Sequence, residues 1–307
     1  MPLDPVVRKY LEEEYYKSNI FDSKKYTIQE IRRMFEERAR KYPKEQIYKI
    51  EDRKIDSNGY EMSVRIYYPD GEKGHPIILY FHGGGWMIGS IETEDSASRI
   101  LTKTCDCIVI SVDYRLAPEY KFPTAVYDCF NSILWAKKNA ESIGGDKDKI
   151  GLFGVSAGGN LVLTSSILAK QKGVKLSVQN AVVPVLGLDL TSKSMMEYRK
   201  GFGLDMGLPI DFMIRNYIRD EKDLLNPLFS PLLAEDLSGL PYTIIITAEY
   251  DPLRDQAEAY AYRLMESGIP TLSVRVNGMI HSFSGSPLVS RQVLVMSGAL
   301  MKDLFNQ

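Results

Sequence analysis

Short apolar stretches of strand length alternate with segments of helical length along most of this chain. The apolar stretches lie at residues 76–81, 108–112, 150–153, 181–185 and 242–247, and residues 271–276 form a further predicted strand. Residues 125–138 and 161–170, which lie between such stretches, have the length and pattern of helices. Uniformly apolar strands are typically buried on both faces, and strands that alternate with helices form parallel sheets. The pattern therefore predicts an α/β fold with a mostly parallel central sheet and helices on both faces.

Two segments depart from this alternation, because residues 1–45 and residues 188–225 each contain two helical patterns with no strand between them. Insertions that follow strands at the carboxyl edge of a parallel sheet hang over the site that this edge forms. We therefore assign both segments to a helical cap, and residues 46–187 and 226–307 to the α/β domain. Residues 62–68 alternate between apolar and polar, which predicts an early, half-exposed antiparallel strand.

Composition excludes several classes of partner. The chain of 307 residues has a net charge of −2, which gives no reason to expect nucleic acid or an anionic membrane as partner. No stretch approaches the roughly 20 apolar residues of a membrane span, and the charged, proline-containing start does not resemble a signal peptide. The chain has three cysteines, Cys105, Cys107 and Cys129, so they cannot all pair, and the first two are too close in the sequence for a relaxed disulfide. Both observations indicate reduced thiols, and therefore a cytoplasmic protein. We expect no bound metal, because the sequence has no cluster of four soft ligands. The sequence leaves it open whether the protein forms a homodimer.

A serine turn at residues 154–158, Gly-Val-Ser-Ala-Gly, directly follows a predicted strand and precedes a predicted helix. A turn this tight forces Ser156 into a sparsely allowed backbone conformation, and the residues two before and two after must be small. Here both are glycine. The geometry exposes the serine hydroxyl to an imidazole on one side and a substrate carbonyl on the other, so Ser156 is the candidate nucleophile.

A glycine loop at residues 82–86, His-Gly-Gly-Gly-Trp, follows another predicted buried strand. Consecutive glycines let backbone N–H groups approach a ligand without a Cβ in the way. A dinucleotide-binding loop is excluded, because no G-x-G-x-x-G can be aligned with this stretch. We expect an oxyanion hole formed by the N–H groups of Gly83 and Gly84 together with that of Ala157.

The order of the remaining candidates completes a triad. His281 is the one histidine that follows Ser156 in the chain, and it comes after the predicted strand at residues 271–276. Asp251 lies a few residues after the preceding strand, and Asp255 is its rival, although it lies deeper in the following helical stretch. Serine, aspartate and histidine in this order, each after a strand, are typical of α/β-hydrolase active sites.

The chain resembles the hormone-sensitive-lipase-like carboxylesterases of the α/β-hydrolase superfamily over nearly its whole length. The motifs that carry the resemblance are residues 82–86, 113–119 (Asp-Tyr-Arg-Leu-Ala-Pro-Glu), 122–123 (Phe-Pro), 156–160 (Ser-Ala-Gly-Gly-Asn) and 251–255 (Asp-Pro-Leu-Arg-Asp). Five motifs in one order make a specific combination. The resemblance implies the α/β-hydrolase fold, with the same roles for the three triad residues and the three amides.

Two positions depart from the pattern of this family. Val155 precedes the nucleophile where the family usually has aspartate, and Ser282 follows the base where glycine is usual. Neither change removes a reacting group. Val155 predicts a weaker hydrogen bond among the residues that support the site, and Ser282 predicts a different position of the loop that contains His281.

Other conspicuous residues receive structural interpretations. The charged groups of residues 113–119 are expected to pair with each other and to brace the glycine loop, while His82 orients that loop. His75 lies in a polar stretch and is expected to be solvated, and Asp255 to form an ion pair. Apolar residues of the cap either line the substrate pocket or form the cap's own core. The pocket candidates are Phe202, Leu204, Phe212 and Met213 of the cap, together with Trp86 of the glycine loop.

The sequence thus predicts a serine carboxylesterase that needs no cofactor and hydrolyses small-molecule esters through an acyl-enzyme. The resemblance implies short or medium acyl chains. An amidase, a deacetylase or an acyltransferase could use the same triad, because the pocket rather than the chemistry distinguishes them. A receptor that only binds its ligand is a further alternative, although the best-known receptors on this fold have lost the base that His281 supplies here.

Overall fold

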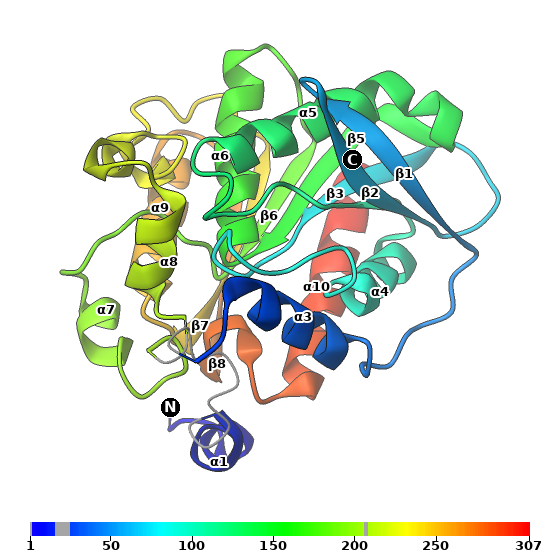
Figure 1. Ribbon diagram of the computed structural model, residues 1–307. Helices are drawn as coiled ribbons and strands as arrows, with labels where there is room; N and C mark the ends of the chain where they lie inside the picture. Colours follow the sequence, from blue (N-terminus) through cyan, green and yellow to red (C-terminus); the bar gives the residue numbers. More distant parts are fainter. Residues whose placement is uncertain (1, 16–24, 206–207) are drawn as a thin grey trace.

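A central eight-stranded sheet organises the computed structural model, which describes residues 2–15, 25–205 and 208–307 (Figure 1). The strand order is β1-β2-β4-β3-β5-β6-β7-β8. β2 pairs antiparallel with both β1 and β4, and every other neighbouring pair is parallel, which confirms the predicted mostly parallel sheet. The strands are β1 (Lys49–Ser57), β2 (Tyr60–Tyr68), β3 (His75–Phe81), β4 (Ile108–Val112), β5 (Gly145–Val155), β6 (Val178–Val182), β7 (Tyr242–Tyr250) and β8 (Thr271–Ile280).

Helices cover both faces of the sheet, as predicted. Each face of the sheet packs into its own apolar cluster, because successive residues of a strand point to opposite faces. Ile77 and Leu79 belong to one cluster, and Ile78 and Tyr80 belong to the other. The first cluster includes side chains of α5, α6 and α9, and the second includes side chains of α4 and α10. These helices are α4 (Asp95–Cys105), α5 (Thr124–Asn139), α6 (Ala157–Gln171), α9 (Arg254–Glu266) and α10 (Pro287–Phe305).

The segments assigned to the cap contain the helices that the sequence predicted there. The N-terminal segment forms α1 (Pro5–Tyr10), which continues as the π-helical turn η1 (Leu11–Tyr15), and then α3 (Ile28–Ala39). The later segment forms α7 (Lys193–Tyr198) and α8 (Ile210–Tyr217), which Figure 1 draws on the opposite side of the molecule from β1 and β2. Short 3₁₀ turns complete the chain at Glu141–Ile143, Pro231–Leu233, Glu221–Leu225 and His281–Phe283.

The two cap segments contact each other and the end of the sheet. The hydroxyl of Tyr15 donates a hydrogen bond of 2.5 Å to the carbonyl of Gly203. Ser194 at the start of α7 accepts from and donates to Asp255 of α9, through Ser194 Oγ and its backbone N–H. The division into a cap and an α/β domain stays a prediction.

The antiparallel edge contains a strand that the apolar pattern did not predict. β1 is mostly polar and partly exposed, so its sequence has no run of buried residues. Its hairpin with β2 turns at Asn58 and Gly59, whose φ angles are 52° and 83°. Asn-Gly between two potential strands is the usual signal for a two-residue hairpin turn, and it could have revealed β1.

The three cysteines form no disulfide. Cys105, Cys107 and Cys129 are buried and free. Within the described parts of the chain, no helix is both long and apolar enough to cross a membrane.

Candidate active site

Ser156 occupies the strained turn that the sequence predicted between β5 and α6. Its φ and ψ angles are 57° and −117°, outside the regions that residues with a side chain usually adopt. A Cβ on Gly154 would lie 2.3 Å from the carbonyl oxygen of Gly158, and a Cβ on Gly158 would lie 2.0 Å from that of Phe81. Both glycines are therefore required by backbone atoms that cannot move aside, and the turn is held in place by β3.

The structure brings Ser156, His281 and Asp251 into one hydrogen-bonded chain. His281 Nε2 lies 2.8 Å from Ser156 Oγ, and His281 Nδ1 lies 2.7 Å from Asp251 Oδ2. All three side chains are buried. The geometry fits a neutral imidazole that donates from Nδ1 to the carboxylate and accepts at Nε2 from the hydroxyl.

The loops after β7 and β8 fix the two partners of the serine. Asp251 accepts a second hydrogen bond at Oδ1 from the backbone N–H of Leu253, at 2.9 Å, so its carboxylate is held on both sides. His281 opens a 3₁₀ turn in which Ser282 has a φ of 56°. This left-handed conformation favours glycine and costs another residue about 1 kcal/mol. The departure at Ser282 therefore places strain directly beside the histidine.

The glycine loop lies against the serine turn. A Cβ on Gly83 would lie 3.0 Å from the carbonyl oxygen of Val155 and 3.7 Å from the Cβ of Ser156. Gly84 has a φ of 105°, and a Cβ there would lie 2.3 Å from the carbonyl oxygen of Ile88. Ala157 is the first residue of α6, where N–H groups have no partner inside the helix. The predicted oxyanion donors thus come from two backbone segments that meet at the serine.

His82 supports the glycine loop from beneath. Its ring is fully buried, stacks on Tyr114 at a centroid distance of 4.1 Å, and bonds the carbonyl of Gly83 through Nδ1 at 2.8 Å. The Tyr114 hydroxyl donates to the carbonyl of His82 at 2.8 Å. Burial lowers the pKa of His82 to about 4, so the ring is neutral. These contacts agree with an orienting role.

The expected pairing within residues 113–119 is wrong, although the segment does contact the glycine loop. Arg115 pairs with the buried carboxylate of Asp128, and Glu119 pairs with Arg32 of α3. Both partners come from distant elements, and local spacing cannot reveal them. The loop is reached instead by the Tyr114 hydroxyl and by a backbone hydrogen bond of 2.8 Å from the N–H of Ala117 to the carbonyl of Trp86.

The five pocket candidates do not share one environment. Trp86 is fully buried and its indole stacks on Tyr217, with 4.4 Å between centroids and 6° between planes; its place in the substrate pocket stays a prediction. Met213 is buried against the glycine loop. Leu204 is half-buried, and Phe212 is 38% exposed.

Phe202 lines a cavity of about 370 Å³ that lies between the cap segments and the end of β7. Its ring stacks on Tyr250, the residue before Asp251, at 5.4 Å between centroids. Residues 2, 3, 8, 11 and 12 of the N-terminal segment also line this cavity. Phe202 therefore lies in an open hollow beside the aspartate loop, while a role in substrate binding stays a prediction.

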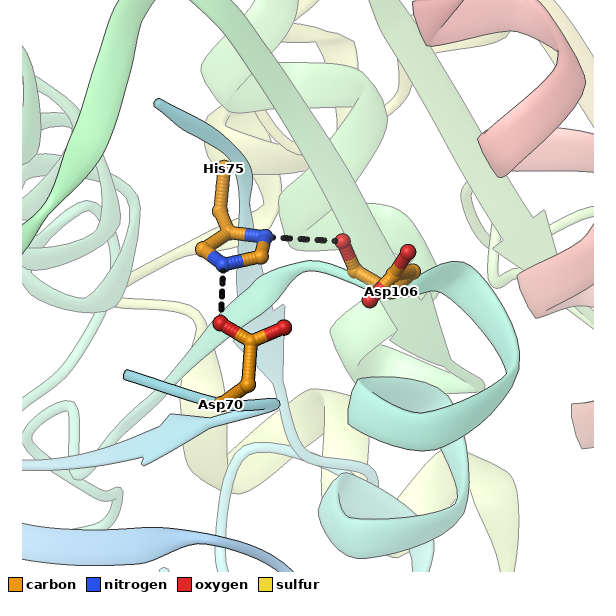
Figure 2. Close-up of side chains that lie close together, drawn as sticks. All are labelled: Asp70, His75 and Asp106. Carbon is orange, nitrogen blue, oxygen red and sulfur yellow. Dashed lines mark hydrogen bonds and ion pairs between the residues drawn. The ribbon is translucent and has the colours of Figure 1, made fainter. Parts of the chain in front are cut away.

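Another histidine, His75, is held between a carboxylate and a backbone carbonyl. Figure 2 shows His75 between Asp70 and Asp106, with Nε2 at 2.8 Å from Asp70 Oδ1 and Nδ1 at 3.3 Å from the backbone oxygen of Asp106. The expectation that His75 is solvated is wrong, since its side chain is 12% exposed. His75 is the first residue of β3 and does not belong to the polar loop before it, so its position in the sheet shields its side chain from solvent.

This cluster is the one group of three potential metal ligands within the part of the chain that the structure describes. Its ligand atoms lie within 4.8 Å of one another. Each charged group already has a partner, because Asp70 bonds His75 and Asp106 pairs with Lys302 at 3.2 Å. The hydrogen bonds tie the start of β3 to the end of α4 and to α10, which makes a structural role sufficient.

Comparison with known proteins agrees with the fold. The family model described as "alpha/beta hydrolase fold" matches residues 78–285. An arylesterase of Saccharolobus solfataricus is 61% identical over 306 residues, which cover 99% of this chain and 100% of the relative. A solved structure described as an arylesterase superposes with a TM-score of 0.94 at 61% identity, over 99% of this chain and 100% of the other.

More distant structures share the same architecture. A hyperthermophilic esterase from the archaeon Pyrobaculum calidifontis superposes with a TM-score of 0.91 at 34% identity, over 99% of both chains. The chain belongs to this α/β-hydrolase family, and the resemblance to the hormone-sensitive-lipase-like carboxylesterases is confirmed.

Proposed function

We propose that this chain, a carboxylic ester hydrolase of the α/β-hydrolase family, cleaves small-molecule esters at Ser156 through an acyl-enzyme intermediate. The observation that carries the proposal is the continuous hydrogen-bonded chain from Ser156 Oγ through His281 to Asp251, at 2.8 and 2.7 Å. A serine hydroxyl is a weak nucleophile unless a base takes its proton during attack. Here the base lies within hydrogen-bond distance, and a buried carboxylate orients it.

In the first step Ser156 Oγ attacks the ester carbonyl carbon while its proton passes to His281 Nε2. Asp251 holds the imidazole in the tautomer with a proton on Nδ1 and stabilises the positive charge that develops on the ring. The tetrahedral intermediate then collapses. The bond from carbon to the alcohol oxygen breaks, and His281 returns its proton to that oxygen, which releases the alcohol and leaves the acyl group on Ser156.

In the second step water replaces the alcohol and follows the same path in reverse. His281 Nε2 takes a proton from water as its oxygen attacks the acyl carbon. Collapse of the second intermediate breaks the bond to Ser156 Oγ, which regains a proton from His281, and the carboxylic acid leaves. The atoms balance without a cofactor.

The oxyanion of both intermediates is assigned to the N–H groups of Gly83, Gly84 and Ala157. Such donors stabilise charge that exists only near the transition state, and each contributes about 10²–10³-fold to turnover. Ala157 also begins a helix of 15 residues, whose N-terminal end carries partial positive charge. The neighbouring serine turn therefore supplies both the nucleophile and part of the electrostatic stabilisation.

For the substrate we propose esters with short or medium acyl chains, with aromatic alcohols among the leaving groups. The full-length relative from Saccharolobus solfataricus is described as an arylesterase, which supports the second part. A cytoplasmic location and a homodimer stay predictions. The three buried, free cysteines are what a reducing compartment would require.

The test is hydrolysis of a series of 4-nitrophenyl esters by the wild type and by Ser156→Ala. We expect hydrolysis with a preference for short or medium acyl chains, and loss of activity in the variant with an unchanged circular dichroism spectrum. Ser142→Ala, an exposed serine on the surface, is the matched control. Turnover of the matching anilides but not of the esters would replace the esterase by an amidase. Binding without turnover of either would favour a receptor.

A further inference from the structure

Helix α8 of the later cap segment packs directly on the glycine loop. Gly85 has a φ of 60°, and a Cβ built there would lie 1.9 Å from Met213 Sδ and 2.9 Å from Met213 Cβ. The thioether of Met213 therefore fills the space that a side chain at position 85 would need. Met213 is 7% exposed, so this contact is sealed from solvent.

A second contact repeats this pairing one turn along the same helix. Tyr217 stacks on Trp86, the last residue of the glycine loop, and its backbone carbonyl accepts a hydrogen bond of 2.8 Å from the N–H of Phe122. Residues four apart lie on the same helix face, so Met213 and Tyr217 form one surface against the loop. Phe212 and Arg215, on the other side of α8, are exposed.

The opposite side of the glycine loop meets the serine turn. Gly83 lies against Val155 and Ser156, and the Gly84 carbonyl accepts hydrogen bonds of 3.1 and 3.0 Å from the N–H groups of Met87 and Ile88. The loop is thus pressed between α8 and the nucleophile. A displacement of α8 would be felt at the amides of Gly83 and Gly84, because packed interiors transmit movement.

We propose that Met213 is a positioning residue that holds the glycine loop in register with Ser156, so that α8 sets turnover and not only the choice of acyl chain. This inference rests on the proposed function, since it takes Gly83 and Gly84 as the oxyanion donors. Met213 touches the loop and not the reacting atoms. Its effect should therefore fall on the transition state and leave ground-state binding of the ester almost unchanged.

The experiment compares Met213→Ala with Met195→Ala. Met195 is an equally buried methionine on α7 of the same segment, and it serves as a control for lost packing. Loss of one aligned donor costs about 10²–10³-fold in turnover, so partial misalignment should lower kcat about tenfold in Met213→Ala with KM within about twofold. Met195→Ala should keep kcat within about twofold. Met213→Leu, which refills the space beside Gly85, should restore most of the lost turnover.

A boronic acid that forms a tetrahedral adduct on Ser156 gives a second readout. Its inhibition constant should weaken in Met213→Ala by the same factor as kcat/KM, and it should stay unchanged in Met195→Ala. Equal losses in the two alanine variants, or an unchanged kcat in Met213→Ala, would overturn the inference. Ser156→Ala separates failure of the proposed function from failure of the role proposed for Met213. If Ser156→Ala remains active, the proposed function fails, whatever Met213→Ala does.

Discussion

Two histidines of the chain each lie between two oxygen atoms, one at the carboxyl end of a strand and the other at the amino end of a strand. His281 follows β8 and bonds a carboxylate through one ring nitrogen and Ser156 through the other. His75 begins β3 and bonds a carboxylate through one nitrogen and a backbone carbonyl through the other. Both rings are largely shielded from solvent. The difference lies in the second partner, which is a hydroxyl on a strained turn in one case and an inert amide oxygen in the other.

A histidine between oxygen atoms is therefore not in itself an active site. In the proposed function, His281 owes its role to what surrounds it, namely the raised serine and the glycine loop at the carboxyl ends of parallel strands, where active sites of such sheets form. His75 lies at the amino end of its strand. The side chains of Asp70, which bonds His75, and of Asp106 are about half exposed. The contacts of His75 with these two residues join the start of β3 to the end of α4.

The largest expected effect separates these two histidines. His281→Ala should lower kcat for 4-nitrophenyl esters by about 10⁴-fold or more, because the serine loses its base. His75→Gln should leave kcat within about twofold. Steady-state kinetics on both purified variants give the comparison directly. Comparable losses in the two variants would mean that the two flanking oxygen atoms, and not the wider surroundings of the histidine, determine function.

The carboxylates give a smaller but similar contrast. Asp251→Asn should lower kcat by about 10²–10⁴-fold, since the imidazole tautomer is no longer fixed while nucleophile and base remain. Asp255→Asn is the matched control four residues on, where the carboxylate pairs with Arg254 and accepts the N–H of Ser194. We expect Asp255→Asn to change kcat by less than about fivefold. A ranking in the opposite order would transfer the orienting role to Asp255.

How much the sequence could reveal depended on whether the determinants were local. The serine turn, the helices and the parallel order follow from residues close together in the chain, and the structure has them. The strand β1, the true partners of Arg115 and Glu119, and the shielding of His75 do not, because each depends on a contact with a distant element. The stacking of Tyr217 on Trp86 could not be predicted for the same reason, since only the fold brings the two rings together.

The third histidine, His82, should make stability depend on pH. Burial lowers its pKa from about 6.5 in the unfolded chain to about 4, so the folded protein resists protonation that the unfolded chain accepts. Its contribution is present above pH 6.5 and is lost as the pH falls toward 4. The loss amounts to about 3 kcal/mol over this window.

Denaturant unfolding of the wild type and His82→Gln at several pH values between 4 and 7 measures this term. The difference between the two proteins isolates it from Asp113, whose pKa burial raises to about 6 and whose contribution therefore has the opposite sign in this range. We expect the free-energy difference to shrink as the pH falls. A difference that is constant with pH would contradict the neutral, buried state of His82.

The smallest expected effect concerns the cap. Phe212→Ala should change the ratio of kcat/KM between long and short acyl esters by about 1–3 kcal/mol, the usual size of one side-chain change in an apolar pocket. Met196→Ala on α7, which is 68% exposed, is the control. An unchanged ratio in Phe212→Ala would remove this residue from the pocket and would leave α8 with the loop contact alone.

Labelling by a fluorophosphonate, followed by mass mapping of the modified peptide, tests most directly whether Ser156 is the nucleophile that His281 activates. We expect a single adduct on Ser156, formed at the wild-type rate in His75→Gln and greatly slowed in His281→Ala. An adduct on another serine, or labelling of Ser156 at an undiminished rate in His281→Ala, would contradict this assignment.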